Sequence, residues 1–199
     1  MTADHIARLK ITLDDVEPQV LRRIEVPLDI RLDRLHLALQ AALGWTNSHL
    51  YEIRARDTGW GAPSPDWDDG PLNAAKARLI DVLEDCGVKT LKYLYDFGDG
   101  WEHTVKVERI LEAVPGVAYP RLIEAIGRCP PEDSGGPWGY ADLLEVSRDP
   151  KHERHEEAAN WLPPDFDPAR VDAEHIAATL ASLAKRWARK PATRKPKTT

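Results

Sequence analysis

The residues best suited to chemistry fall in two short motifs, YLYDFGDGWEH at residues 93–103 and CPPEDSGGPWGY at residues 129–140. The first motif carries Asp96, Asp99 and His103, and the second carries Glu132 and Asp133. Carboxylate oxygens and imidazole nitrogens are ligands for magnesium, manganese or zinc. A bound ion would supply the electrostatic stabilisation that hydrolysis of a phosphodiester needs. These five residues are candidate metal ligands, provided that the fold brings the two motifs together.

The first motif is typical of the turn of a β-hairpin. Apolar and polar residues alternate over residues 88–97 and 101–111, and Gly98-Asp99-Gly100 separates the two runs. The glycines permit the positive backbone angles of a tight turn. The alternation predicts that His103 points into the core with the neighbouring apolar residues. A buried imidazole then needs a hydrogen-bond partner, either a carboxylate or a main-chain carbonyl.

The second motif predicts a rigid bend. Its prolines disfavour helix, Gly135-Gly136 permits a sharp turn, and Pro137 can begin a helix. The two acids either cap main-chain amides of the loop or form a pocket with the hairpin. On the second alternative, Glu132 or Asp133 lies within hydrogen-bonding reach of the DFGDGWEH hairpin, through His103 or the turn amides. The predicted pocket consists of Asp96, Asp99, Trp101, His103, Glu132, Asp133, Trp138 and Tyr140.

The elements that must position these motifs follow from periodicity. Alternation predicts strands at 5–13, 20–27 and 49–56, and apolar spacings of three and four predict helices at 30–45 and 77–84. Residues 57–75 are rich in Gly, Pro and Asp and are expected to be a long loop, whereas 139–149, 151–162 and 171–187 are expected to be helical. We therefore expect an α+β fold, with a mostly antiparallel sheet, packed helices, and C-terminal helices after the strands.

Charge is unevenly spread along the 199 residues. Residues 185–199 hold seven Lys/Arg and no acid, which leaves 20 bases against 33 acids in the rest, a net charge of −13. An acidic body argues against a broad nucleic-acid surface, so nucleic acid is expected to bind only through the basic tail, if at all. We expect one domain over residues 1–188 and a disordered tail over 189–199.

Several protein classes are excluded. There is no apolar run of transmembrane length and no signal peptide, and the two cysteines, Cys86 and Cys129, suit a reducing compartment. We therefore expect a cytoplasmic protein without membrane contact. The DFG tripeptide at residues 96–98 is not accompanied by the other protein-kinase motifs, and no Walker A, GxSxG or HExxH sequence is present.

Three segments in this order resemble one known family: DRLHLALQAALGWTNSHLYEI, YLYDFGDGWEH and CPPEDSGGPWGY. It is the plasmid ORF-three-like family, whose members are also labelled insertion-element passenger or TnpR-like proteins. The resemblance extends to about Leu183 and implies no established reaction. The TnpR label would imply a site-specific recombinase, but the phosphate-binding arginines that such an enzyme places around its nucleophile are missing from the motifs.

Two hypotheses about function remain open. The first is a non-enzymatic binding or interaction module without a cofactor, which binds an unknown protein or small molecule through the polar pocket. Its support is the lack of a recognised catalytic set and the tryptophans in turn-rich segments, Trp60, Trp67 and Trp138. The alternative is a metal-dependent hydrolase acting on phosphodiesters or nucleic acid, with a divalent ion held by Asp96, His103, Glu132 and Asp133.

Overall fold

The computed structural model describes residues 5–63, 70–162 and 166–188. The strands are β1 (His5–Leu13), β2 (Leu21–Pro27), β3 (Tyr51–Ala55), β4 (Thr58–Gly61), β5 (Leu72–Asn73), β6 (Thr90–Tyr95), β7 (Trp101–Glu112) and β8 (Arg121–Ile126). They form one sheet in the order β5-β4-β3-β6-β7-β1-β2-β8. All neighbours are antiparallel except β4 and β5, so the predicted mostly antiparallel α+β fold is confirmed.

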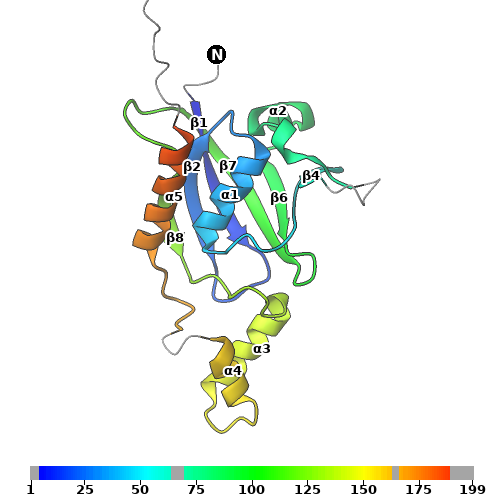
Figure 1. The fold of residues 1–199 in the computed structure, drawn as a ribbon, viewed down its shortest axis with the longest axis vertical. Helices are drawn as coiled ribbons and strands as arrows, with labels where there is room; N and C mark the ends of the chain where they lie inside the picture. Colours follow the sequence, from blue (N-terminus) through cyan, green and yellow to red (C-terminus); the bar gives the residue numbers. More distant parts are fainter. Residues whose placement is uncertain (1–4, 64–69, 163–165, 189–199) are drawn as a thin grey trace, which may run out of the picture.

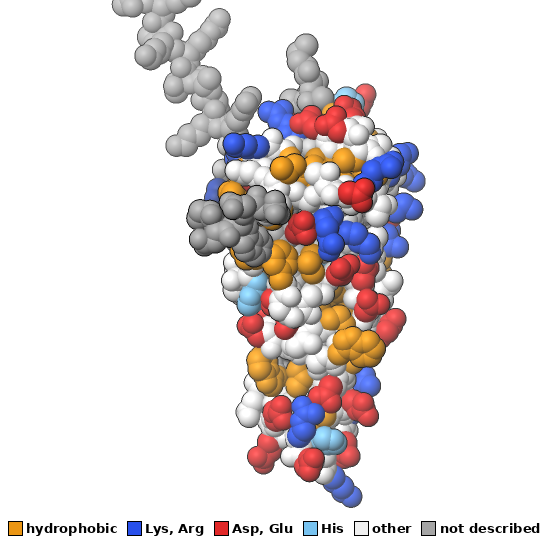
Figure 2. Space-filling model, turned by 90° about the vertical axis from the view of Figure 1, so that its right-hand side faces the viewer, with side chains coloured by type: hydrophobic (Ala, Val, Ile, Leu, Met, Phe, Trp, Pro, Cys, Tyr) orange, Lys and Arg blue, Asp and Glu red, His pale blue; other side chains and the backbone are white. Residues whose placement is uncertain are grey.

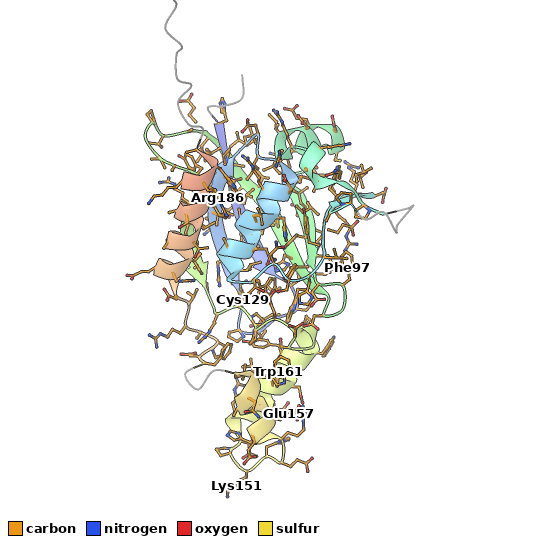
Figure 3. All side chains as sticks on the ribbon, viewed as in Figure 1. Phe97, Cys129, Lys151, Glu157, Trp161 and Arg186 are labelled. Carbon is orange, nitrogen blue, oxygen red and sulfur yellow. The ribbon has the colours of Figure 1, made fainter. Side chains whose placement is uncertain are left out.

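The helices are α1 (Leu32–Leu43), the 3-10 helix η1 (Ala74–Lys76), α2 (Leu79–Cys86), α3 (Gly136–Arg148), α4 (His155–Trp161) and α5 (Ala173–Trp187). Figure 1 shows α1 and α5 side by side on one face of the sheet. The pair α3 and α4 projects below the sheet, between β8 and α5 in the chain. Figure 3 labels Lys151 at the tip of this projection and Cys129 where the projection leaves the sheet. The C-terminal helices therefore follow the strands, as predicted.

Helix α1 lies where its leucine spacing predicts. Leu32, Leu35, Leu39 and Leu43 are all buried against the sheet. Burying a leucine side chain contributes about 1.5–3 kcal/mol, so this stripe alone fixes the helix on the sheet. Gly44 ends the helix at φ 86°, a left-handed conformation that costs glycine little. The chain therefore turns sharply at Gly44 into the segment that precedes β3.

The other face of the sheet is polar and held by ion pairs. Glu25 on β2 accepts hydrogen bonds from Arg8 at 2.6 Å and from Arg121 at 2.6 Å. Burial alone would raise the pKa of Glu25, but these two guanidinium groups outweigh it and lower that pKa. Arg23 bridges Glu108 and Glu124 in the same way. In Figure 2, acidic, basic and hydrophobic side chains are interspersed over the face that is drawn, with no single basic patch.

Some expectations from the sequence need correction, and others concern residues outside the described ranges. The segment 57–75 is not one long loop, because it contains β4, β5 and η1; Trp60 on β4 is buried, with 8% of its surface exposed. Strand β8 was not predicted. The tail at 189–199 and Trp67 lie outside the described residues. Among the residues that are described, no helix is long and apolar enough to cross a membrane.

Candidate functional site

The first motif forms the predicted hairpin between β6 and β7. Tyr93 pairs with His103 and Tyr95 with Trp101, and all four side chains are buried. The turn begins at Asp96, which has φ 57° and whose Oδ1 accepts a hydrogen bond from the Gly98 amide at 3.0 Å. An aspartate tolerates this left-handed conformation because its short side chain can bond to nearby amides. The turn therefore fixes Asp96 at the end of β6.

The second motif is fastened to the hairpin turn. The Gly135 amide donates to Asp99 Oδ2 at 3.1 Å. A Cβ atom on Gly136, which has φ 69°, would lie 2.2 Å from the Asp99 carbonyl oxygen, so only glycine lets the two backbones approach this closely. The loop also reaches helix α1, since Trp45 Nε1 donates to the Pro130 carbonyl at 2.9 Å. The two motifs therefore meet, as predicted.

Glu132 joins the loop to two other segments. Its Oε1 accepts from the Tyr95 hydroxyl at 2.5 Å, and its Oε2 accepts from the Thr46 amide at 2.9 Å and the Thr46 hydroxyl at 2.6 Å. Burial raises the pKa of Tyr95 to about 12, and its hydrogen bond to Glu132 adds to this effect. Glu132 is thus in reach of the hairpin, but through Tyr95 and not through His103 or the turn amides.

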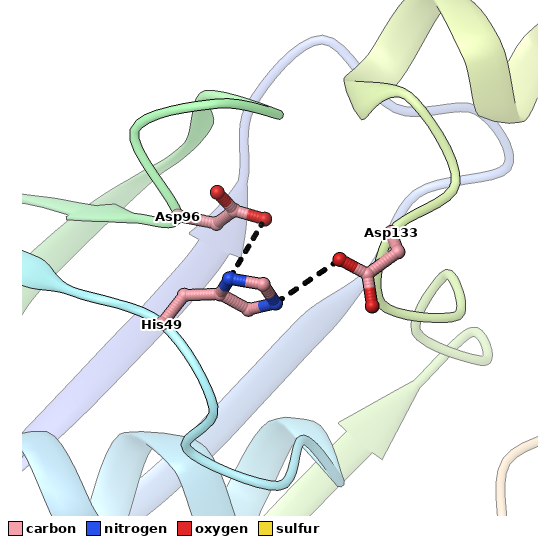
Figure 4. A group of neighbouring side chains, drawn as sticks. All are labelled: His49, Asp96 and Asp133. Atoms are coloured by element: carbon pink, nitrogen blue, oxygen red, sulfur yellow. Dashed lines mark ion pairs between the residues drawn. The ribbon is translucent and has the colours of Figure 1, made fainter.

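A histidine and two carboxylates meet between the turn and the loop (Figure 4). His49 Nε2 lies 3.2 Å from Asp133 Oδ1, and His49 Nδ1 lies 3.6 Å from Asp96 Oδ2. One donor atom from each residue fits in a group whose members are all within 4.8 Å of one another. The side chains are 27% exposed for His49, 11% for Asp96 and 63% for Asp133. We call His49, Asp96 and Asp133 the turn–loop triad.

The triad is not held together by its own hydrogen bonds. The 3.6 Å distance from His49 to Asp96 is too long for one. His49 Nε2 is at ion-pair distance from Asp133, but it makes no properly angled hydrogen bond with any described residue. Asp133 has φ 58°, so both acids are held in a left-handed backbone conformation. Strained positions of this kind concentrate at ligand sites.

His103 does not join the triad. It is fully buried, and its Nδ1 donates to the Tyr93 carbonyl at 3.0 Å, so of the two predicted partners the main-chain carbonyl is the one present. The carbonyl can only accept, which places the proton on Nδ1. Nε2 has no partner among the described residues, and the imidazole packs edge-on with the Trp45 ring at a centroid distance of 5.3 Å. Burial lowers the pKa of His103 to about 4.

The remaining predicted pocket residues are placed differently from one another. Trp101 is a core residue beside Trp45. Tyr140 is buried on α3 with its ring edge against Phe166. Trp138, on the first turn of α3, is 89% exposed. The structure therefore brings together Asp96, Asp99, Glu132 and Asp133 from the predicted set.

Sequence reasoning missed His49, Tyr95 and Thr46 as site residues. Segment 46–50, between α1 and β3, could have pointed to two of them, because its polar residues TNSH interrupt two apolar elements. This segment is built firmly: the Asn47 amide donates to Gln40 at 3.0 Å, and Asn47 Oδ1 accepts from His36 Nε2 at 2.5 Å. Tyr95 supports it as well, since its hydroxyl accepts from the Ser48 amide at 3.0 Å.

The arrangement has the composition of a metal site. One imidazole nitrogen and two carboxylate oxygens suit zinc or manganese, and three protein ligands leave coordination positions for water or a bound molecule. Asp99 and Glu132, by contrast, already accept hydrogen bonds from main-chain amides and, in the case of Glu132, from hydroxyls. Asp99 and Glu132 therefore fasten the loop, Asp133 faces His49, and Asp96 does both, with Oδ1 on the Gly98 amide and Oδ2 toward His49.

Comparison with known proteins assigns the family. The model of the plasmid pRiA4b ORF-3-like protein family matches residues 5–175. Uncharacterized protein y4hQ of Sinorhizobium fredii (strain NBRC 101917 / NGR234) is 54% identical over 186 residues, 93% of this chain and 95% of that protein. The crystal structure of MM3350, a protein of unknown function from Methanosarcina mazei Go1, has a TM-score of 0.78 at 37% identity. It covers 87% of this chain and 98% of its own. With these matches, the chain belongs to the plasmid pRiA4b ORF-3-like protein family.

Proposed function

We propose that this protein is a binding module whose ligand site is the turn–loop triad, and that the triad binds a divalent metal ion. The observation that carries the proposal is the convergence of three donor atoms within 4.8 Å from residues 49, 96 and 133. Each comes from a different segment, and each segment is fixed by hydrogen bonds other than contacts among the three triad residues.

The electrostatics favour a cation at this place. Asp96 Oδ2 and Asp133 have no hydrogen-bond donor among the described residues other than the poorly aligned His49. Two carboxylates this close together repel each other unless a proton or a cation lies between them. Asp96 is nearly buried, whereas Asp133 is 63% exposed, so water screens the repulsion from the Asp133 side only. A divalent ion would satisfy both acids and the unpaired imidazole nitrogen at once.

Metal binding to the tag-free protein tests the proposal. After dialysis against excess Mn²⁺ or Zn²⁺ and removal of the free ion, elemental analysis should find about one ion per chain. Asp96→Asn and His49→Gln should each weaken binding at least about 10-fold in calorimetric titration, since even loss of an outer-sphere partner costs that much. Asn tolerates the left-handed backbone and keeps an oxygen for the Gly98 amide, so Asp96→Asn should fold normally.

Two controls make the test specific. Glu174→Gln removes an exposed acid from the first turn of α5 and should leave metal affinity unchanged. His103→Gln removes a metal ligand that was predicted from the sequence but that is not part of the triad, so this variant should also bind metal normally. Equal affinity of the wild type and both triad variants would contradict the proposal, as would loss of binding in His103→Gln with binding retained in His49→Gln.

A metal-dependent phosphodiesterase is the second candidate. It is favoured by the three-ligand set, which leaves room for water and substrate on the ion, and by the neighbouring Tyr95–Glu132 pair, which offers a proton donor and acceptor. Incubation with bis(p-nitrophenyl) phosphate and Mn²⁺ decides between the two. Turnover that disappears in Asp96→Asn would support the enzyme, whereas metal binding without turnover would support the binding module.

A further inference from the structure

A second site lies away from the triad, at the junction of α1, β2 and α5. A cavity of about 510 Å³ opens between the end of α1, the segment 128–132 and residues 170–176. Figure 3 places Cys129 above Trp161 in this region, where the α3–α4 projection joins the sheet. Both residues line the cavity, together with Phe166 and several cationic side chains.

Arg22 is the unusual member of the lining. It is only 1% exposed, yet it has no carboxylate within ion-pair distance in the part of the chain that the structure describes. Its Nε donates to the Ala42 carbonyl at 2.7 Å, and its Nη1 donates to the carbonyls of Leu21 at 2.8 Å and Ile126 at 2.7 Å. These carbonyls aim the side chain, but they do not neutralise its charge.

The second terminal nitrogen of Arg22 is left over. Nη2 donates to no atom within the described ranges. Burial lowers the pKa of Arg22, but a guanidinium group remains protonated at neutral pH. A buried charge without a counter-ion is costly, so natural proteins almost always pair it. Arg22 is thus a buried cation that lines a cavity and has no anionic partner among the residues that the structure describes.

The rest of the lining adds positive charge and aromatic surface. Arg128 lies over the Phe166 ring, with its guanidinium carbon 4.5 Å from the ring centroid, and Arg170 lines the same cavity. Trp161 is 44% exposed. The acids among the described lining residues already have partners: Glu132 accepts from Tyr95 and Thr46, and Asp172 accepts from the His175 amide at the start of α5.

We infer that this cavity binds a small organic anion, with its oxyanion on Arg22 and Arg128 and a planar ring beside Trp161 and Phe166. A guanidinium group offers paired donors that match a carboxylate or a phosphate. Aromatic rings provide a flat apolar surface for the remainder of the ligand. Burial raises the pKa of the Cys129 thiol to about 12, so the cavity lacks a thiolate nucleophile and is suited to binding.

Calorimetric titration with three probes of similar size tests this inference. Phenyl phosphate, phenylacetate and benzyl alcohol share the ring and differ in charge. We expect the two anions to bind and the neutral alcohol to bind at least about 10-fold more weakly, the loss expected for one charge-assisted hydrogen bond. A preference for phenyl phosphate identifies a phosphate ligand, and a preference for phenylacetate identifies a carboxylate ligand. Equal binding of all three, or no binding of either anion, would overturn the inference.

Variants assign the binding to this cavity. Arg128→Gln should weaken the tighter anion about 10-fold or more, and Arg22→Lys should do so as well, because lysine cannot keep the carbonyl contacts and the free donor together. If Arg22→Lys fails to fold, Arg128→Gln and the probe comparison still decide. Arg109→Gln, which removes an exposed arginine on β7, is the matched control and should bind as the wild type does. Unchanged affinity in Arg128→Gln would contradict the assignment.

The site is independent of the triad. Glu132 lines the cavity, but its carboxylate oxygens accept hydrogen bonds from Tyr95 and Thr46. None of the triad residues lines the cavity. Asp96→Asn should therefore leave anion affinity unchanged while it weakens metal binding. Loss of anion binding in Asp96→Asn would show instead that the anion sits on a metal ion in the triad.

Discussion

His103 should make this protein sensitive to acid. Burial lowers the pKa of His103 to about 4, whereas an imidazole in the unfolded chain has a pKa of about 6.5. Between these values the unfolded state binds more protons than the folded state, so the free energy of unfolding falls as the pH drops through this window. The two pKa values give a loss of about 2 kcal/mol between pH 7 and pH 5, and of about 3 kcal/mol below pH 4.

His36 doubles the effect. Burial lowers its pKa to about 4 as well, and it outweighs the hydrogen bond from Nε2 to Asn47, which by itself would raise that pKa. The buried ring stacks on Tyr51 at a centroid distance of 3.5 Å. The two histidines together should cost about 4 kcal/mol at pH 5. This is a large part of the 5–15 kcal/mol that stabilises a typical domain. The carboxyls of Glu25 and Glu108 have lowered pKa values and stay ionised at pH 5, so the histidines dominate there.

Urea unfolding of wild type and His103→Gln at pH 7 and pH 5, followed by tryptophan fluorescence, measures this effect. The variant should be less stable at pH 7 by about 1–3 kcal/mol, because the Tyr93 carbonyl loses its donor. Its further loss at pH 5 should be only about 2 kcal/mol, since one histidine remains. His5→Gln removes an exposed histidine and is the control. The same pH dependence in His103→Gln and wild type would refute the reasoning.

Two further pairs of variants test how the loop meets the hairpin. Gly116 has φ 82° and open space around it, so Gly116→Ala should lower the free energy of unfolding by about 1–2 kcal/mol, the cost of the left-handed backbone. Gly136 has φ 69°, and Gly136→Ala should lower it further, because the Asp99 oxygen must also move. Equal losses of thermal stability in the two variants would contradict the close approach. Glu132→Gln should destabilise by about 1–3 kcal/mol, and Asp133→Asn should not destabilise in denaturant titrations without metal, since Asp133 has no described donor except His49. Greater destabilisation by Asp133→Asn than by Glu132→Gln would show that the assignment of roles is wrong.

Periodicity predicted the elements that bury one clean face. The alternation in β6 and β7 matches the buried positions in the structure, and the leucine spacing of α1 does so too. Strands β4 and β8 were missed for different reasons. β4 is only Thr58–Gly61 and contains two glycines, which weaken any strand pattern. β8 lies at the edge of the sheet, and its Ile123 and Ile126 are partly exposed, so it shows no regular alternation.

The triad could not be predicted because its geometry depends on strand pairing. Tyr51 pairs with Tyr95 across β3 and β6, and the Asp96 amide donates to the Leu50 carbonyl at 2.9 Å. This register places Leu50, just before β3, beside Asp96, just after β6, and so brings the preceding residue, His49, to face Asp96. Neither strand alone specifies its partner. The inward direction of His103 was correctly predicted, but its partner is simply the carbonyl of the residue opposite, Tyr93.

The three segments on which the family resemblance rests meet at one place in the structure. Segment 44–50 supplies Thr46 and His49, the hairpin supplies Tyr95 and Asp96, and the proline-rich loop supplies Glu132 and Asp133. Three structural turns could meet through main-chain bonds alone, and here part of the contact is of that kind. What such a contact leaves unexplained is a second set of polar atoms, on His49, Asp96 and Asp133, that face one another without stabilising the junction. Turn packing does not require their convergence on rigidly held backbone, and this convergence is the reason that we propose a ligand site here.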